Sequence, residues 1–523
     1  MQEATRRRLR RAGATVLALA TLALVLFGVG RATAELPAPP AGAPTQAWSR
    51  PLESELGREL AREAGLAPDA SAYLLLSAGA DALAARLAMI EAAERAIDFQ
   101  YYMLVRDASG ELVVRRLLEA ADRGVRVRML LDDFGSGGLD GWMPELDAHA
   151  NVEVRYFNPL ARGPLGALNR LADLVARMGR LDHRMHNKLL AVDGAVAVVG
   201  GRNVGDEYYG LGREMNFADA DLLVTGAVLA TLGEDFDRYW NSEVVCDVDH
   251  WQRLRRDAAA LDTLRERLAG AGVEPSTAAA AERLLADLES GARRWTEAEM
   301  FAGADSPEKA RAELDVERLF ERIRRAMGPA REELLIVSPY LIPGERGTAE
   351  LVGMVAGGVR VAILTNSLAA TDVAAVHAGY SRYRRALIEG GVELYELKPV
   401  GEAQRFNPLA GSSGASLHAK SFCQDRERVF VGSLNLDPRS VRLNTEQGLL
   451  VRSAELASEF RERFESGIAR ENSWRVRLDD AGELVWESAE YGRAVTRTAE
   501  PDASRARRWS ARVFAWLPLE GRL

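Results

Sequence analysis

An internal duplication constrains the fold of this chain more than any other feature. Two segments follow the same pattern: His-x-Lys, four residues, Asp, six residues and Gly-(Gly/Ser)-x-Asn. The first segment runs from His186 to Asn203, and the second runs from His418 to Asn435, 232 residues further along. A single His-x-Lys triplet carries no information, but two complete copies indicate that the chain consists of two homologous halves.

Shorter matches in the same order surround the two copies. Gly124-Val-Arg-Val127 leads into an apolar run, and Gly358-Val-Arg-Val361 does the same in the second half. In both halves, helical periodicity alternates with short apolar runs typical of strands. We expect helices at 80–94, 111–123 and 347–356, and strands at 96–104, 125–131, 333–341 and 359–365. This alternation predicts an α/β fold, in which helices cover the faces of a sheet.

Lysine and histidine are scarce, which makes their positions informative. Only four of the 67 basic residues are lysines, and there are only six histidines. Half of the lysines and a third of the histidines lie in the two motif copies. In a chain so rich in arginine, a retained lysine indicates a position that needs a compact ammonium group. The presence of only two cysteines excludes a disulfide scaffold and a cysteine zinc cluster.

The N-terminus has the pattern of an export signal. Five arginines at 6–11 precede 19 uncharged residues at 12–30, and Ala32-Thr33-Ala34 resembles a cleavage site. The run fits either a cleaved signal peptide or an uncleaved anchor of about 20 residues, and both export the rest of the chain. Removing residues 1–34 changes the net charge from −9 to about −14, which disfavours binding of nucleic acid or of an anionic bilayer by bulk charge.

The duplicated pattern resembles the motif of the phospholipase D superfamily, whose members pair two copies in one site. The residue types suit this chemistry, because lysine and asparagine side chains can hold the oxygens of a phosphodiester. One imidazole can attack phosphorus while the other protonates the departing alkoxide. The resemblance implies a phosphohistidine intermediate, with no metal and no other cofactor. By the resemblance, His186 is the nucleophile and His418 the general acid and later base, although the residues alone do not distinguish these roles.

The resemblance also implies which side chains form the site. The catalytic candidates are His186, Lys188, Asp193, Asp219, His418, Lys420, Asp425 and Glu446, and the substrate-binding candidates are Lys188, Asn203, Lys420, Ser433 and Asn435. In the family, the motif aspartates orient the surrounding loop, and a later carboxylate steadies each histidine. Alignment of the final β-runs pairs Glu446 with Asp219 rather than with Asp221. Gly201 stands where the family often has serine, so the first copy lacks one hydroxyl contact.

More of the chain resembles the cardiolipin synthase C branch of this superfamily. The matching stretches are 200–209, 217–221, 236–242, 338–343, 364–372 and 377–380. The resemblance implies transfer of a phosphatidyl group to a hydroxyl on another lipid, with phosphatidylglycerol and a second phospholipid, such as phosphatidylethanolamine, as substrates. Three alternatives stay open: a phospholipase D that uses water as acceptor, an exported nuclease, and a membrane scaffold with an inactive site.

These patterns divide the chain and place it at a membrane. The expected parts are a signal peptide or anchor at 1–34, a linker and N-terminal helix at 35–69, a first phospholipase D-like lobe at 70–250, a helical connector at 251–330, and a second lobe with a C-terminal tail at 331–523. The resemblance implies that each lobe is a mixed sheet flanked by helices and that one active site lies between them. We expect the catalytic body on the exported, periplasmic side of a bacterial cell membrane, with phospholipids and no nucleic acid as partners.

Two regions outside the motif carry further expectations. Residues 165–181 have an apolar face, which fits a helix packed on the domain core or, as the less favoured alternative, a helix docked on a bilayer. The C-terminal tryptophans are expected to be packing residues: Trp474, Trp486, Trp509 and Trp516.

Overall fold

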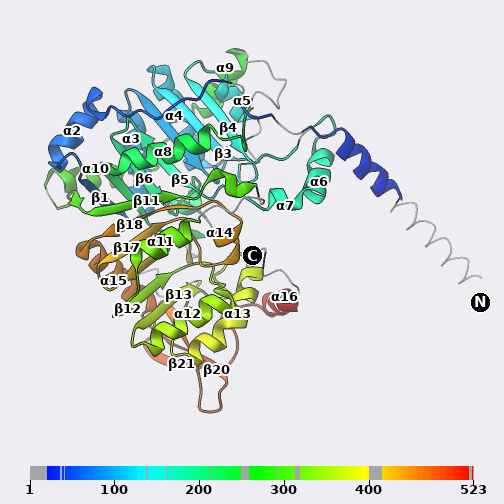
Figure 1. Cartoon of the computed structure of the whole chain (residues 1–523), viewed down its shortest axis with the longest axis vertical. Helices are drawn as coiled ribbons and strands as arrows, with labels where there is room; N and C mark the ends of the chain where they lie inside the picture. The colour runs from blue at the N-terminus through cyan, green and yellow to red at the C-terminus, as the bar shows by residue number, and fades with distance from the viewer. Residues whose placement is uncertain are drawn as a thin grey trace, which may run out of the picture.

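The computed structural model has two lobes stacked along the long axis of the molecule (Figure 1). It describes residues 21–516 and 521, apart from 36–37, 41, 137–138, 140, 162, 214, 249–257, 291, 312–317 and 400–414. Each lobe is a mixed sheet with helices packed against it, which confirms the predicted α/β class.

The first lobe contains a nine-stranded sheet in the order β10-β1-β8-β6-β5-β2-β3-β4-β9. Its strands are β1 (Ser71–Leu76), β2 (Ala96–Tyr101), β3 (Arg126–Asp132), β4 (Val152–Phe157), β5 (Lys188–Val192), β6 (Val196–Gly200), β8 (Asp221–Gly226), β9 (Val245–Asp247) and β10 (Thr296–Glu297). Its helices are α2 (Glu55–Ala64), α3 (Gly79–Ala92), α4 (Ala108–Asp122), α5 (Trp142–Asp147), α6 (Ala167–Ala176), α7 (Met178–Leu181), α8 (Val228–Trp240), α9 (Ala258–Leu268) and α10 (Pro275–Glu289). Strands β2, β3 and β4 are parallel, and the remaining pairings are antiparallel.

The second lobe repeats this arrangement in a ten-stranded sheet, β11-β18-β17-β16-β12-β13-β14-β19-β20-β21. Its strands are β11 (Glu299–Ala304), β12 (Glu333–Val337), β13 (Arg360–Asn366), β14 (Glu393–Leu397), β16 (Lys420–Gln424), β17 (Arg428–Gly432), β18 (Gln447–Arg452), β19 (Ser473–Leu478), β20 (Leu484–Glu490) and β21 (Arg493–Arg497). Its helices are α11 (Leu319–Met327), α12 (Gly344–Ala356), α13 (Ala374–Glu389), α14 (Pro438–Arg442), α15 (Ala454–Ile468) and α16 (Arg505–Trp516). Strands β12, β13 and β14 are the parallel set, so the two sheets share one topology.

The lobes are joined by apolar packing and by backbone pairing. One buried cluster includes residues of both halves, among them Val199, Leu222, Val431 and Leu449. A separate two-stranded parallel sheet pairs β7 (Asn216–Ala218) with β15 (Ala415–Leu417), and each of these strands comes from a different half. Strand order, shared core and bridging sheet together hold the two motif copies in fixed positions relative to one another.

The main differences from the sequence-based expectation lie at element ends and in the connector. Strand β12 stops at Val337 rather than at 341, because Ser338 precedes a proline and the chain turns there. The region 251–330 contains the expected helices but also β10 and β11, which belong to different sheets. The chain therefore passes from one lobe to the other at Ala298.

The described part of the N-terminal region is a helix followed by a segment without regular secondary structure at 43–50, which we call the strap. Residues 21–32 are helical and project from the body (Figure 1), while most of the expected export signal lies outside the described residues. No helix among the described residues has the length and hydropathy needed to cross a bilayer. The strap is fixed to α8 by the amide of Ala47, which donates to both oxygens of Asp237.

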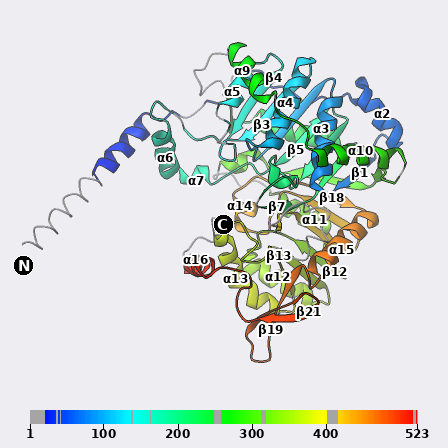
Figure 2. The same cartoon turned by 180° about the vertical axis from the view of Figure 1, so that it is seen from behind.

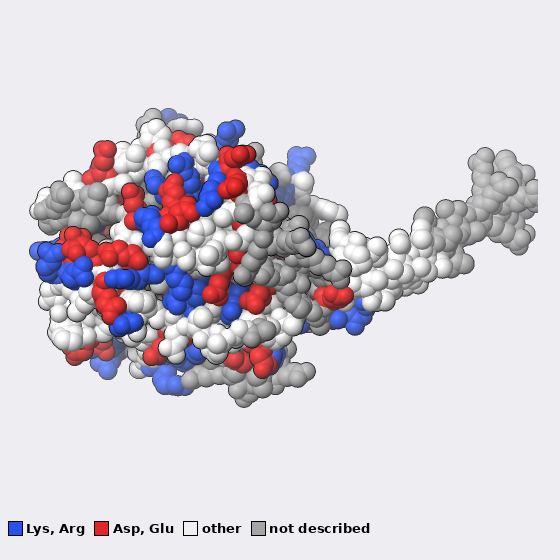
Figure 3. Space-filling view, turned by 90° about the horizontal axis from the view of Figure 1, so that it is seen from above, with Lys and Arg blue, Asp and Glu red and all other residues white. Residues whose placement is uncertain are grey.

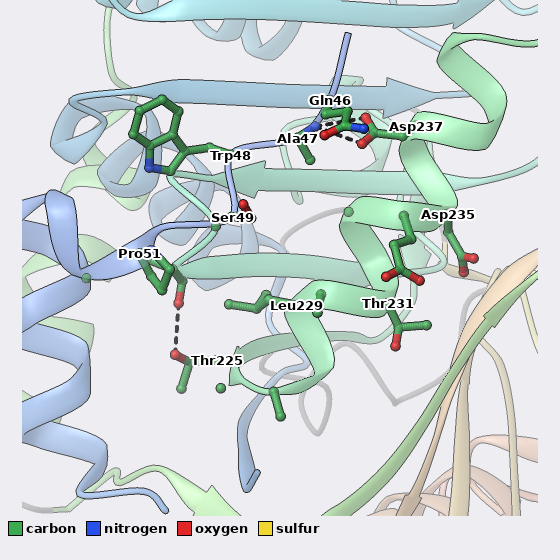
Figure 4. A pocket seen from close by; sticks show the side chains of 18 of the residues that line it. Gln46, Ala47, Trp48, Ser49, Pro51, Thr225, Leu229, Thr231, Asp235 and Asp237 are labelled. Carbon is green, nitrogen blue, oxygen red and sulfur yellow. Dashed lines mark hydrogen bonds between the residues drawn. The ribbon is translucent and has the colours of Figure 1, made fainter. Parts of the chain in front are cut away.

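A cleft of about 1550 Å³ lies between this strap, α2 and α8, as Figure 4 shows. Trp48, Leu229 and Asp235 are among its lining residues, whereas the motif histidines and lysines are not. This cleft is therefore separate from the duplicated motif.

Candidate active site

Each motif copy forms a β-hairpin, and its aspartate lies in the turn. Asp193 and Asp425 have positive φ angles of 54° and 53°, which asparagine and aspartate tolerate better than most residues. The carboxylate of Asp193 accepts hydrogen bonds from the amides of residues 94–96, and Asp425 does the same with residues 331–333. Both side chains fix the hairpin to the start of the neighbouring strand and do not reach the histidines. This geometry fits the loop-orienting role that the resemblance implies for Asp193 and Asp425.

His186 lies just before β5 and contacts a carboxylate from the other lobe. Its Nδ1 is 2.9 Å from Oε2 of Glu446, which directly precedes β18. The amide of His186 also donates to the carbonyl of Thr445 at 2.8 Å. Because a carboxylate can only accept, Nδ1 carries the hydrogen and Nε2 is left with its lone pair.

His418 has the reciprocal arrangement. Its Nδ1 is 2.6 Å from Oδ2 of Asp219, which lies two residues before β8 in the first lobe. The amide of His418 donates to the carbonyl of Ala218 at 2.9 Å. Each lobe therefore supplies one histidine and the carboxylate that orients the histidine of the other lobe.

The two carboxylates differ in length, and their neighbours differ to match. Ser433 donates its hydroxyl to Oε2 of Glu446, so this serine positions the carboxylate. At the equivalent place in the first copy, a Cβ on Gly201 would lie 2.2 Å from Oδ1 of Asp219. The shorter carboxylate occupies the space that a serine would need, so the structure accounts for the missing hydroxyl. Asp221 is buried and pairs with arginines instead, away from both histidines.

The two motif lysines are fully buried beside the histidines. Lys188 donates to the backbone carbonyl of His186, and its Nζ lies 5.7 Å from the ring centre of Tyr102. Lys420 donates to the backbone carbonyl of His418, and its Nζ is 2.9 Å from Nδ1 of the same histidine. Both ammonium groups thus sit two residues from a histidine on the same side of the strand, as the alternation of a strand requires.

Burial controls the protonation of this site. It lowers the pKa of His186 and of His418 to about 4, with Lys188 and Lys420 adding to the effect and Glu446 and Asp219 opposing it. Burial also lowers the pKa of Lys420 to about 8 and that of Lys188 well below its ordinary value. Each lysine acts electrostatically on the histidine of the other copy, so the two copies form one site.

These shifts predict how stability depends on pH. Between pH 4 and 6.5 the unfolded chain binds protons at His186 and His418 that the folded chain does not bind, so stability falls as pH falls. The expected loss is about 1 kcal/mol per pH unit for each histidine. Thermal unfolding midpoints of the wild type and of a His186→Asn/His418→Asn variant, followed from pH 7 to 4.5, measure this, and the variant should lose less stability. Equal slopes for the two proteins would contradict the predicted burial effect.

The two motif asparagines, which were expected to bind the substrate, differ in the hydrogen bonds that their side chains already make. Asn203 donates to the hydroxyl of Tyr208 at 2.8 Å and accepts from the amide of Met103, so its side chain is already engaged. Asn435 donates to Oγ of Ser440, and its Oδ1 is buried without a hydrogen bond among the described residues. Asn435 can therefore still accept a hydrogen bond, whereas Asn203 positions its neighbours.

Aromatic rings complete the surroundings of the histidines. Tyr102 packs edge-on against His186 at 5.4 Å between ring centres, and Tyr208 packs in the same way against His418 at 5.1 Å. Phe217 lies 4.9 Å from His418. The motif spacing gave no signal for these residues, because they come from other segments of the first lobe. In the part of the chain that the structure describes, no cluster of three or more His, Cys, Asp or Glu residues is arranged to hold a metal ion.

Two lobes of one topology with paired His-Lys motifs at their junction define a phospholipase D-type enzyme. The chain belongs to the family described as "Cardiolipin synthase, PLD-like domain", whose model matches residues 87–240 and 323–468. It is 40% identical to cardiolipin synthase C of Escherichia coli over 84% of this chain and 93% of that protein. It is 30% identical to cardiolipin synthase A of Pseudomonas syringae over 74% of this chain and 66% of that protein. A crystal structure of phosphatidylserine synthase from Haemophilus influenzae shares the fold, with a TM-score of 0.56 and 13% identity over 86% of this chain and 95% of that one.

Proposed function

We propose that this protein is a cardiolipin synthase that joins the phosphatidyl group of one phospholipid to a hydroxyl of phosphatidylglycerol. The reciprocal pairing of His186 with Glu446 and of His418 with Asp219 carries the proposal, because it presents two oriented imidazoles to one phosphodiester. The 40% identity to cardiolipin synthase C supports the choice of reaction. The donor is phosphatidylglycerol or phosphatidylethanolamine.

In the first half-reaction, Nε2 of His186 attacks the donor phosphorus. A phosphorus–nitrogen bond forms, the bond from phosphorus to the headgroup oxygen breaks, and Nε2 of His418 gives its proton to that oxygen. Glu446 steadies the positive charge that develops on His186. In the second half-reaction, His418 takes the proton of the acceptor hydroxyl, whose oxygen attacks phosphorus and releases His186.

The buried lysines stabilise the charge of the phosphoryl oxygens. Burial weakens the preference of Lys188 and Lys420 for the charged form, since it lowers the pKa of both groups. An anionic phosphodiester restores the balance by supplying the counter-charge, so the lysines bind the substrate in their protonated form. The same counter-charge favours the protonated His418 that the first step needs.

The alternatives differ in acceptor and in substrate. A hydrolase would use water in the second half-reaction, but the two histidine side chains are only 12% and 9% exposed, and aromatic rings surround them. A nuclease would need a basic groove, whereas the chain has a net charge of −9. On the outer face that Figure 3 shows, positive and negative side chains are interspersed. We further propose that the N-terminal segment exports the body to the periplasmic side of the membrane, where both lipid substrates are available.

The deciding experiment follows the fate of labelled phosphatidylglycerol. The purified chain is incubated with it, with and without phosphatidylethanolamine, and the lipid products are separated. We expect labelled cardiolipin, with the released headgroup identifying the donor, and no product from a His418→Asn control. Phosphatidic acid as the sole product would overturn the proposal in favour of the hydrolase.

Gly201→Ser tests the fit of the shorter carboxylate. The new Cβ would lie 2.2 Å from Oδ1 of Asp219 and displace it from His418. A displacement of a catalytic group by about 1 Å costs on the order of 10²-fold in rate. We therefore expect kcat for cardiolipin formation to fall by about that factor. Gly353→Ala in α12, where no neighbouring atom lies within 4 Å of the new Cβ, serves as the control and should retain kcat. Wild-type kcat in a folded Gly201→Ser variant would show that the site tolerates serine here.

A further inference from the structure

The large apolar side chains that are exposed gather on a few segments. Among the described residues, all but three of the 17 exposed large hydrophobic side chains belong to the helix 21–32, the loop after β3, the segment 165–175, Val373 and α16. The exceptions are Leu52, Val273 and Tyr491. Helices α6, α7 and α16 lie on the same side of the molecule in two opposite views (Figures 1 and 2). Monomeric soluble proteins seldom concentrate apolar surface in this way without a binding partner.

Helix α6 exposes apolar side chains that were expected to pack on the core of the domain. Leu171 is 56% and Val175 is 54% exposed, whereas Asn169 and Asp173 on the opposite face are buried and hydrogen-bonded. The favoured expectation that the apolar face packs on the core was therefore wrong for these residues. The side-chain amide of Asn169 donates a hydrogen bond to the backbone carbonyl of Gly30, which attaches the N-terminal helix to α6.

Helix α16 is the counterpart on the second lobe. Trp509 is 68% and Trp516 is 90% exposed, in contrast to the buried Trp474 and Trp486, so the expectation that all four pack inside was wrong for two. Trp509, Val513 and Trp516 share one face with Arg505 and Arg512, because they are spaced by three or four residues. The helix contains four arginines and no acidic residue, although the chain as a whole is acidic.

Both helices are linked to the active site through short segments of the chain. Arg507 of α16 donates to the carbonyls of Leu368 and Thr371, in the loop that follows β13. Asn366, at the end of the same strand, exchanges hydrogen bonds with Leu417, the residue before His418. On the first lobe, α7 ends five residues before His186. The segment of α6 and α7 therefore leads into the first motif copy, and α16 is linked through the loop after β13 to the residue before the second histidine.

We propose that α16 and α6 form one docking face for a phospholipid bilayer with anionic headgroups. Exposed tryptophan beside arginine on a short helix is the pattern of a segment that lies in the membrane interface, and the arginines match anionic lipid phosphates in charge. The proposal rests on the proposed function only in taking a lipid surface as the partner. Docking sets the distance between the headgroups and the two histidines, so lipid reaches the site without leaving the membrane.

Quenching of tryptophan fluorescence by brominated lipid tests this without any turnover. The full chain is reconstituted in vesicles of brominated phosphatidylcholine and phosphatidylglycerol. We expect Trp509→Ser/Trp516→Ser to remove most of the quenched signal, and Tyr491→Asn, which removes an exposed aromatic side chain elsewhere, to leave it unchanged. Arg505→Gln/Arg512→Gln should reduce the quenching at least twofold with phosphatidylglycerol present and leave it unchanged in phosphatidylcholine alone.

The outcomes separate this proposal from the proposed function. Equal quenching in the wild type and in the double tryptophan variant overturns the docking face, whatever the reaction products are. A tryptophan-dependent dimer in detergent, without quenching by lipid, overturns it in favour of an interface between two copies of the chain. Quenching together with phosphatidic acid as the only product would support the docking face and contradict the synthase.

Discussion

His186→Asn and His418→Asn will each lower the rate of cardiolipin formation by at least about 10⁴-fold, the size of loss seen when a covalent nucleophile or its partner acid is removed. Asparagine can imitate the Nδ1 hydrogen bond to the carboxylate, but it has no nitrogen that attacks phosphorus or moves a proton. The measurement is the initial rate with labelled phosphatidylglycerol. His149→Asn, a change in a histidine outside the motif that is not fully buried, is the control and should retain the rate.

The two variants should differ in the intermediate they accumulate. Without His418, attack by His186 on a donor with a good leaving group can still proceed, and the second half-reaction stalls, so labelled phosphoenzyme should be trapped. Without His186 no phosphoenzyme should form. Label trapped in the His186 variant but not in the His418 variant would reverse the assignment of nucleophile and acid.

Glu446→Gln and Asp219→Asn will each lower kcat by about 10²- to 10⁴-fold, because an amide reverses or loses the hydrogen bond that sets the imidazole tautomer. The shape of the side chain is preserved, so the loss reports on charge and tautomer rather than on packing. Glu427→Gln, in the exposed turn after β16, is the matched control and should keep kcat near the wild-type value.

The arrangement across the lobes makes a second, more specific prediction. The charge of Glu446 raises the pKa of His186, so Glu446→Gln should lower the pKa of His186 further and leave His418 nearly unchanged. Asp219→Asn should have the converse effect. Imidazole resonances of isotope-labelled histidine can follow both groups, since the chain has only six histidines. A response confined to the histidine of the same half would contradict the structure.

The scarcity of lysine correctly indicated positions that need a compact ammonium group, but it did not indicate the role of each lysine. All four lysines are buried. Lys188 and Lys420 lie at the site, whereas Lys309 pairs with Asp305, whose carboxylate accepts the amide of Glu446. Lys398 donates to the carbonyl of Ala489 and lies over the ring of Trp474. A compact ammonium suits all four places, and only the structure separates catalysis from support.

The sequence by itself determined the duplication, the α/β lobes and the identity of the histidines, lysines and carboxylates that meet at the centre. These properties depend on residue type and on spacing along the chain, which a periodic strand or hairpin translates directly into position. The tertiary structure alone decided that each histidine pairs with a carboxylate of the other lobe and that Trp509 and Trp516 face solvent. These outcomes depend on contacts between segments far apart in sequence, and local pattern carries no information about which distant surfaces meet.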